Sequence, residues 1–191
     1  MAGSDVAPRI AALGVLRDVS AGGYADRSAS GRFEGLSSRD RRLAQQLAYG
    51  TIRLRARLDA ELRTLSTRPL DQLDSAVLDA LRLGLYQLRE TRIPAHAAVN
   101  ETIDAVRGLV SPGARGLLNA VLRRAAREQP GEHVYGNPRE DPVRYLTSWG
   151  SHPEWLVRRW LDRWPLAAVR RLVENDNQPP PVTLRASANT P

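Results

Sequence analysis

The stretch Arg39–Leu62, RDRRLAQQLAYGTIRLRARLDAEL, decides the fold of this 191-residue chain. Its leucines recur every three or four positions, a spacing that places side chains on one stripe of an α-helix. We therefore expect one helix, capped at its start by Ser37 or Ser38 and buried along one face. Gly50 interrupts the stripe and predicts the close approach of another helix, because glycine costs about 1 kcal/mol relative to alanine inside a helix. The leucines of the stripe are Leu43, Leu47, Leu54, Leu58 and Leu62, and Leu65 continues it.

The remaining faces of this helix are rich in arginine. The whole chain has 28 Lys and Arg residues against 21 Asp and Glu, a formal net charge of +7, and all of its cations are arginines. Residues 1–128 hold 20 arginines against 14 acids, whereas residues 129–191 hold 8 against 7. The positive charge thus lies in the first part, as nucleic-acid binding requires, although many soluble proteins share a basic balance. The arginines of the helix are Arg39, Arg41, Arg42, Arg53, Arg55 and Arg57.

Composition excludes several classes of protein. The chain has no cysteine, which removes disulfides, zinc ribbons and thiol nucleophiles together. No run of about eighteen apolar residues exists, so a membrane span is excluded, and the first residues lack the apolar core of a secretory signal. We therefore expect a cytoplasmic protein. His96 and Asn100 share a helix face without a third ligand nearby, so we expect no metal site.

The rest of the first part also predicts helices. A first helix starts near Pro8, with Ser4 or Asp5 as its cap, and the stretch 24–37 predicts a loop or a short, weak helix. Asp71 is expected to cap a further helix. The last helix signals in this part are Pro94, which opens a helix, and the pair Ser111 and Pro112, which begins one that ends near Glu128. No stretch of this part alternates with period two, so the predicted class is all-α.

The second part begins with a predicted linker at 129–142, QPGEHVYGNPREDP, which is rich in proline, glycine and charge. Residues 143–191 then predict a short helical region, with helices opened by Asp141-Pro142 and by Pro165. Val182–Arg185 is a possible strand without a partner, so the chain looks cut there. Three tryptophans could form one apolar face that packs on the bundle or on a further part, although base stacking is the alternative. They are Trp155, Trp160 and Trp164.

Several phrases stand in an order typical of one family. They are RDRRLAQQLAYGTIR, LRLGLYQL, TRIPAHAAVNETID and LLNAVLRRAAR. Together they resemble the NusB-like RNA-binding region at the front of the bacterial 16S ribosomal RNA cytosine-5 methyltransferases of the RsmB (Sun/Fmu) family. SHPEWLVRRW and NDNQPPPVTLR resemble the segment leading into the RRM-like region of those enzymes. The resemblance implies a NusB-like helical bundle over 1–128, a linker over 129–142, and the helical start of a truncated second domain over 143–191.

A rival family is the free-standing antitermination factor NusB, which binds a leader RNA together with ribosomal protein S10. It shares the helix start made here by Pro94, Asn100 and Glu101. Three features resemble the methyltransferase type instead. Two are sets of residues, and the third is that the chain continues beyond the last helix of the bundle. The sets are Tyr49, Gly50 and Arg53, and Asn119, Val121, Leu122 and Arg123.

The chain departs from the methyltransferase family in its chemistry. Those enzymes bind S-adenosylmethionine on a Gly-rich turn after a strand, and a cysteine thiolate attacks C6 of cytosine. This chain has neither, so we expect no catalysis by it alone and no cofactor in it, and S-adenosylmethionine is implied only for the full-length family. Ala186-Ser187 also replaces the usual apolar-Asn pair. We expect a fragment, a natural truncation or the product of a frameshifted gene; a third hypothesis is an interaction remnant that docks on a separate methyltransferase domain through its tryptophans.

The predicted partner is ribosomal RNA, with no catalytic residue, no metal ligand and no membrane contact. Arginines along a helix can bind phosphates, and an amide among them can reach a base edge. The alternatives are structural: arginines near a helix C-terminus also favour the macrodipole, and Arg53 could form an internal ion pair. The predicted RNA-binding residues are Arg9, Arg39, Arg42, Arg53, Asn119, Arg123 and Arg124, and further candidates are Arg17, Arg41 and Arg127.

Overall fold

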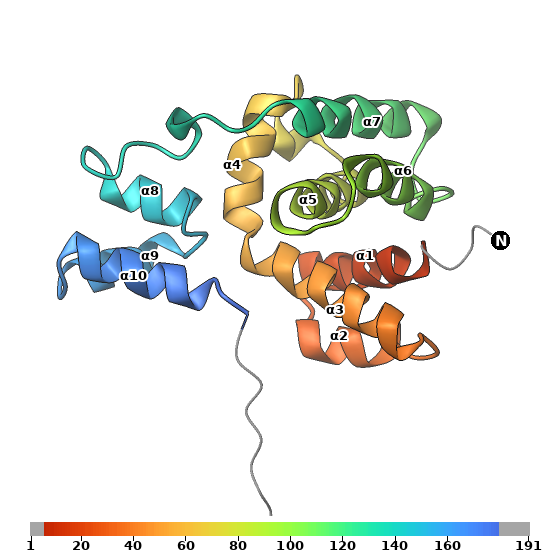
Figure 1. The fold of residues 1–191 in the computed structure, drawn as a ribbon, viewed down its shortest axis with the longest axis horizontal. Helices are drawn as coiled ribbons and strands as arrows, with labels where there is room; N and C mark the ends of the chain where they lie inside the picture. Colours follow the sequence, from red (N-terminus) through yellow and green to blue (C-terminus); the bar gives the residue numbers. More distant parts are fainter. Residues whose placement is uncertain (1–5, 180–191) are drawn as a thin grey trace, which may run out of the picture.

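The computed structural model describes residues 6–179, and over this range every regular element is a helix (Figure 1). The predicted all-α class is therefore confirmed. The α-helices are α1 (Ala7–Ser20), α2 (Ala25–Arg32), α3 (Ser38–Arg53), α4 (Arg55–Leu65), α5 (Ser75–Glu90), α6 (Ala95–Ala105), α7 (Pro112–Arg127), α8 (Pro142–Ser148), α9 (Glu154–Leu161) and α10 (Leu166–Asp176), and short 3-10 turns lie at Leu70–Gln72 and Glu132–Val134.

Helix α5 is the centre of a bundle formed by α1 to α7. It packs against α1, α3, α4, α6 and α7, and Figure 1 shows it enclosed by them. Leu81, Leu83 and Leu85 on this helix are fully buried although they point in different directions. A helix with apolar side chains on several faces is stable only inside such a shell, so the sequence of α5 fixes its central position.

The leucine stripe is buried as predicted, but the single helix predicted around it is wrong. The stripe is divided between α3 and α4, which meet at Leu54. Leu47, Leu54, Leu58 and Leu62 are buried, whereas Leu43 is half-buried. At the break the amide of Ala56 donates a hydrogen bond of 3.0 Å to the hydroxyl of Ser151. A contact between residues so far apart in the chain is invisible to periodicity, so the break could not be predicted.

Gly50 lies where another helix comes close, as predicted. A Cβ atom built on Gly50 would collide with the phenol ring of Tyr86 on α5. The absence of a side chain at this position therefore allows α3 and α5 to approach each other, and this contact offsets the low helix propensity of glycine.

Most predicted helix starts are confirmed, with one correction. Pro8 lies in the first turn of α1, while the predicted caps Ser4 and Asp5 lie outside the described residues. Ser111 accepts the Ala114 amide at the start of α7. Asp71, by contrast, belongs to a 3-10 turn, and Asp74 caps α5 by accepting the Ala76 amide at 2.8 Å. The prediction for Asp71 is wrong because the chain makes this extra turn, which buries Leu70, before α5 begins.

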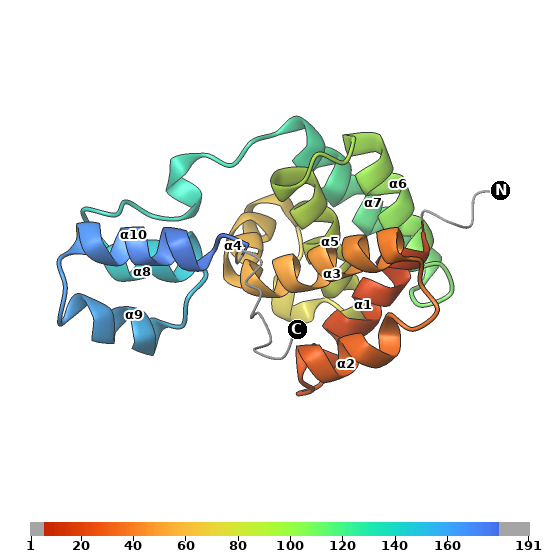
Figure 2. The same cartoon turned by 60° about the horizontal axis from the view of Figure 1, so that its bottom comes forward.

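Helices α8 to α10 form a second, smaller unit beside the bundle (Figure 2). Its buried centre consists of Leu146, Val157, Val169 and Val173. The tryptophan face predicted for α9 is therefore only partly right: Trp160 packs against this centre, but Trp155 and Trp164 are 66% and 47% exposed. The division at 128/129 and 142/143 stays a prediction, and the predicted strand Val182–Arg185 lies outside the described residues. None of the described helices is long and apolar enough to cross a membrane.

Candidate nucleic-acid interface

Arg9 lies inside the bundle and not on its surface. Arg9 is only 2% exposed. Its Nε donates to Oε1 of Gln87 at 2.8 Å, and its Nη1 lies 2.6 Å from the carboxylate of Glu101. The prediction that Arg9 contacts RNA is therefore wrong for this fold. Arg9 lies four and seven positions before the buried Leu13 and Leu16, a spacing that places it on the buried face of α1. Its residue type argues against burial, because arginine is rarely fully buried unless it is paired.

Helix α7 presents a polar face that includes two of the predicted RNA contacts. Leu118, Val121, Leu122 and Ala125 bury the opposite face. Arg123 donates from Nε to Oδ1 of Asn119 at 2.7 Å, and Arg123 is exposed. The bond holds the guanidinium over the helix with its remaining donors toward solvent, an arrangement suited to binding phosphate. Whether RNA contacts this pair stays a prediction.

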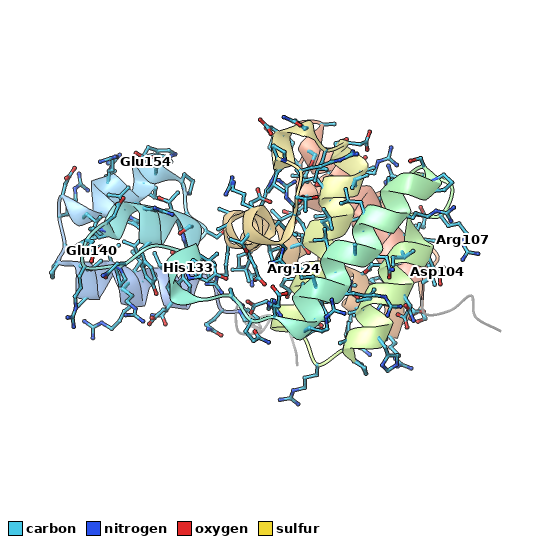
Figure 3. All side chains as sticks on the ribbon, turned by 90° about the horizontal axis from the view of Figure 1, so that it is seen from above. Asp104, Arg107, Arg124, His133, Glu140 and Glu154 are labelled. Atoms are coloured by element: carbon cyan, nitrogen blue, oxygen red, sulfur yellow. The ribbon has the colours of Figure 1, made fainter. Side chains whose placement is uncertain are left out.

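Arg124 faces the other side of α7 and has structural partners. Its Nε donates to the carboxylate of Glu128 at 2.9 Å, and its Nη1 donates to the carbonyl oxygens of Thr64 and Leu65 at 3.3 Å. Those carbonyls belong to the last turn of α4, which leaves such groups without a partner inside the helix. Arg124, placed near α4 in Figure 3, therefore joins the ends of α4 and α7. This geometry favours the structural alternative for Arg124 over RNA contact.

Arg42 and Arg53 lie together in a groove of about 800 Å³. One wall is a stripe of α3, on which residues three, four, seven and eleven positions apart share a face. The other wall comes from the second unit, with Trp149 after α8 and Asn177 after α10. The groove is therefore a composite of both units. The α3 stripe consists of Arg42, Gln45, Gln46, Tyr49 and Arg53.

Carboxylates also line this groove, and each of them has a partner. Asp26 accepts a hydrogen bond of 2.6 Å from the Tyr49 hydroxyl. Glu90 is bound by Arg57 at 3.4 Å, and Glu174 by Arg170 at 3.0 Å. Arg42 and Arg53, in contrast, form no ion pair with any residue between 6 and 179. The internal ion pair considered for Arg53 is thus not formed, and both guanidinium groups remain available to a ligand.

Tyr86 lies at the floor of the groove and is 8% exposed. The hydroxyl end of its ring rests on Gly50, which also lines the groove. Burial raises the pKa of this phenol, while Glu90 raises and Arg53 lowers the same pKa. Burial, together with the bond to Asp26, raises the pKa of Tyr49 to about 12. Both phenols therefore keep their protons at neutral pH and can act as donors.

Arg57 connects the two walls of the groove. Its Nε donates to the carbonyl oxygen of Trp149 at 2.6 Å, and its guanidinium lies 4.9 Å from the centre of the Trp149 ring. Tyr145 stacks on Trp149 with ring centres 5.0 Å apart. Arg57 therefore fixes Trp149, and with it the wall formed by the second unit, against α4.

Sequence reasoning missed several groove residues. The stripe from Arg42 to Arg53 was visible as a helical spacing, and Gln45 and Gln46 stand in the quoted stretch. No such signal existed for Tyr86 or Trp149, because they reach the groove only through tertiary packing.

The predicted residues form two surfaces. Figure 1 shows α7 and α3 on opposite sides of α5, so Asn119 and Arg123 lie apart from Arg42 and Arg53. Arg39 is exposed in the first turn of α3 and does not line the groove. Within the described range no cluster of His, Asp and Glu could hold a metal ion.

Two family models match the chain. The model of the NusB family matches residues 6–127, which comprise the bundle. A model described as "Methyltr_RsmF/B-like, ferredoxin-like domain" matches residues 152–189, and α9 and α10 lie in this range. Among solved structures, that of PH0851 has a TM-score of 0.66 at 12% identity, and it covers 90% of this chain and 37% of its own. At this identity the likeness shows the fold alone.

Similar curated proteins carry the name ribosomal RNA small subunit methyltransferase B. The one from Pseudomonas putida KT2440 is 40% identical over 181 residues, which are 94% of this chain and 40% of the relative. The one from Escherichia coli O139:H28 is 36% identical over 152 residues, or 80% of this chain and 34% of the relative. The chain thus spans about two fifths of the length of the first of these relatives, and the resemblance to their NusB-like region is confirmed. Through residues 6–127, this chain belongs to the NusB family.

Proposed function

We propose that the chain is the ribosomal-RNA-binding module of a ribosomal RNA cytosine-5 methyltransferase. The observation that carries this proposal is the set of surface arginines without carboxylate partners in the NusB-family part. Arginines without a carboxylate partner leave a positive charge that a polyanion can neutralise. Among the described residues this set includes Arg39, Arg42, Arg53, Arg123 and Arg127.

The module would position RNA, and the chemistry would lie elsewhere. Phosphate contacts supply affinity and register, while amides such as Asn119 read base edges. In this proposal S-adenosylmethionine and the catalytic cysteine belong to the part of the longer relatives that the chain does not span. A cytoplasmic location follows from the same proposal, because that is where bacterial ribosomal RNA is found.

A salt titration tests the proposal. Binding of the full chain to a small-subunit ribosomal RNA transcript is measured by fluorescence anisotropy at increasing salt. For each phosphate contact, the decimal logarithm of the affinity should fall by about 0.7 to 0.9 for every tenfold rise in salt concentration. Arg123→Glu should weaken binding by about tenfold, the loss expected for one charged contact. Arg159→Glu, an equal charge change at an exposed position of α9, is the control and should have a smaller effect.

Binding that ignores both salt and Arg123→Glu would contradict the proposal. Antitermination is the second candidate, because the bundle belongs to the NusB family. Retention of ribosomal protein S10 in a pull-down with the full chain would favour it, since the methyltransferase module does not require that partner.

A further inference from the structure

The groove between the two units has a tyrosine hydroxyl at its floor, that of Tyr86. Tyr86 is more than nine-tenths buried, and its hydroxyl forms no hydrogen bond with any residue in the described range. In the described range the fully buried side-chain atoms without a partner belong to Thr51 and Thr147, and the Tyr86 hydroxyl is not one of them. It therefore opens into the groove, beside Gly50, and can donate to an acceptor from outside the protein. The acceptor must be able to reach a recessed donor.

The groups around Tyr86 define the chemistry of that acceptor. Arg53 is close enough to lower the pKa of Tyr86, and Arg42 lies further along the same stripe of α3; neither has an ion-pair partner among residues 6–179. The two guanidinium groups can only donate, and the phenol hydroxyl can donate as well, so together they suit a phosphate. Gln45 and Gln46 add amide groups that both donate and accept, as the edge of a nucleobase requires.

We propose that this groove binds an unpaired segment of RNA, with a phosphate held by Arg42, Arg53 and the Tyr86 hydroxyl and a base beside Gln45 and Gln46. This inference rests on the proposed function and names the form of RNA that the module binds. The volume of about 800 Å³ lies within the range of roughly 300–1,000 Å³ that is typical of small-molecule sites. It therefore accommodates a short stretch of a flexible strand.

The recessed position of the donors excludes a duplex as the ligand of the groove. Double-stranded RNA is recognised through phosphates and 2′-hydroxyls on the outside of a rigid helix. Such a helix can contact exposed arginines like Arg39 but cannot bring a phosphate down to Tyr86. A single strand can turn a phosphate inward and place the adjoining base against the groove wall, where Tyr49 and Trp149 offer aromatic rings.

The composite nature of the groove also couples RNA binding to the second unit. Trp149 and Asn177 line the wall opposite α3, and Arg57 fixes Trp149 to α4. A strand bound in the groove therefore contacts both units at once. A ligand that contacts both walls favours the arrangement of the two units in which both contacts can form. A bound strand would therefore hold the second unit in a fixed orientation to the bundle.

The test uses Tyr86→Phe, which removes only the hydroxyl and keeps the ring on Gly50, together with Arg53→Gln. Binding of these variants of the chain is measured by fluorescence anisotropy with labelled single-stranded RNA oligonucleotides of mixed sequence and with a blunt-ended RNA duplex. Tyr86→Phe should weaken single-strand binding by about threefold to tenfold, the loss of one hydrogen bond. Arg53→Gln should lower the slope of the salt dependence by about 0.7, the value for one phosphate contact on a single strand. Arg159→Gln is the control and should match the unaltered chain.

The outcomes separate this inference from the proposed function. Failure of the unaltered chain to bind any RNA overturns both. Normal binding by Tyr86→Phe and Arg53→Gln, with a loss only in Arg123→Glu, overturns the groove site and leaves the proposed function standing. An equal loss for the single strand and the blunt-ended duplex overturns the assignment to unpaired RNA. A last outcome is that Tyr86→Phe and Arg53→Gln bind RNA normally, while the unaltered chain binds an acidic peptide that Arg53→Gln does not bind. It would show that the groove binds a protein instead.

Discussion

Arg9 and Arg82 are buried arginines whose charges are fully used inside the bundle. Arg9 binds Gln87 and Glu101, and Gln87 in turn donates to the hydroxyl of Thr102 at 2.8 Å. Arg82 donates to both oxygens of Asp59, at 2.7 and 2.8 Å, and to Asp79 at 3.0 Å. At both sites oxygen acceptors bind the guanidinium group, and such pairing is the condition for burying a charge. The RNA-binding charge of the bundle is therefore smaller than its arginine content suggests.

Arg9→Ala should destabilise the protein without changing its intrinsic affinity for RNA. The substitution leaves the carboxylate of Glu101 and the amide of Gln87 without their partner, and breaking a buried pair costs about 3–5 kcal/mol. Urea denaturation followed by circular dichroism measures the free energy of unfolding. Arg17→Ala, on the exposed part of the same helix, is the control. A loss as small as that of the control would contradict a structural role for Arg9.

The break between α3 and α4 is the element that links the bundle to the second unit. A helix that restarts at Arg55 has amide groups without partners in its first turn. The hydroxyl of Ser151, ninety-five positions further along the chain, accepts one of them from Ala56. Ser151 has a φ of 57°, a left-handed conformation that non-glycine residues seldom adopt. The second unit thus supplies a cap that α4 lacks in its own sequence, at the cost of local backbone strain.

Ser151→Ala should cost about 1 kcal/mol, the value for loss of a helix cap. Ser151→Gly should cost less, because glycine adopts a positive φ without strain and so offsets part of the loss. The free energy of unfolding ranks the variants, and hydrogen exchange locates the effect, since the Ala56 amide should exchange faster in both. An unchanged exchange rate at Ala56 would show that the contact is not formed in solution.

At the scale of the whole molecule, Arg57 holds the two units together. It contacts the carbonyl oxygen and the ring of Trp149 and also pairs with Glu90. These contacts combine a charged hydrogen bond with a cation–π interaction, so the second unit is attached by polar contacts at one edge of α4.

Arg57→Ala should loosen the second unit while leaving the bundle core intact. Loss of the charged hydrogen bond should cost about 2 kcal/mol at the contact, and Trp149 should become more accessible to solvent. Acrylamide quenching of tryptophan fluorescence measures that accessibility. The neighbouring Arg55→Ala, which removes an exposed arginine without an ion pair in the described range, is the matched control. Equal quenching in the two variants would contradict the attachment through Arg57.

The sequence by itself determined the helical class, the buried leucine stripe and most of the helix starts. These features depend on residues within a few positions of each other, which is the range over which helix periodicity and capping act. It also showed that the faces outside the leucine stripe carry arginines, Arg42 and Arg53 among them. The resemblance to the NusB family rested on phrases in chain order and was confirmed.

Only the tertiary structure decided which arginines remain available and where the groove lies. Arg9 and Arg123 both stand on amphipathic helices, yet one is paired inside the bundle and the other is exposed. The break at Leu54, the recessed hydroxyl of Tyr86 and the wall at Trp149 all arise from contacts between distant parts of the chain. Such contacts depend on how whole helices pack, and packing distances are not encoded in local spacing.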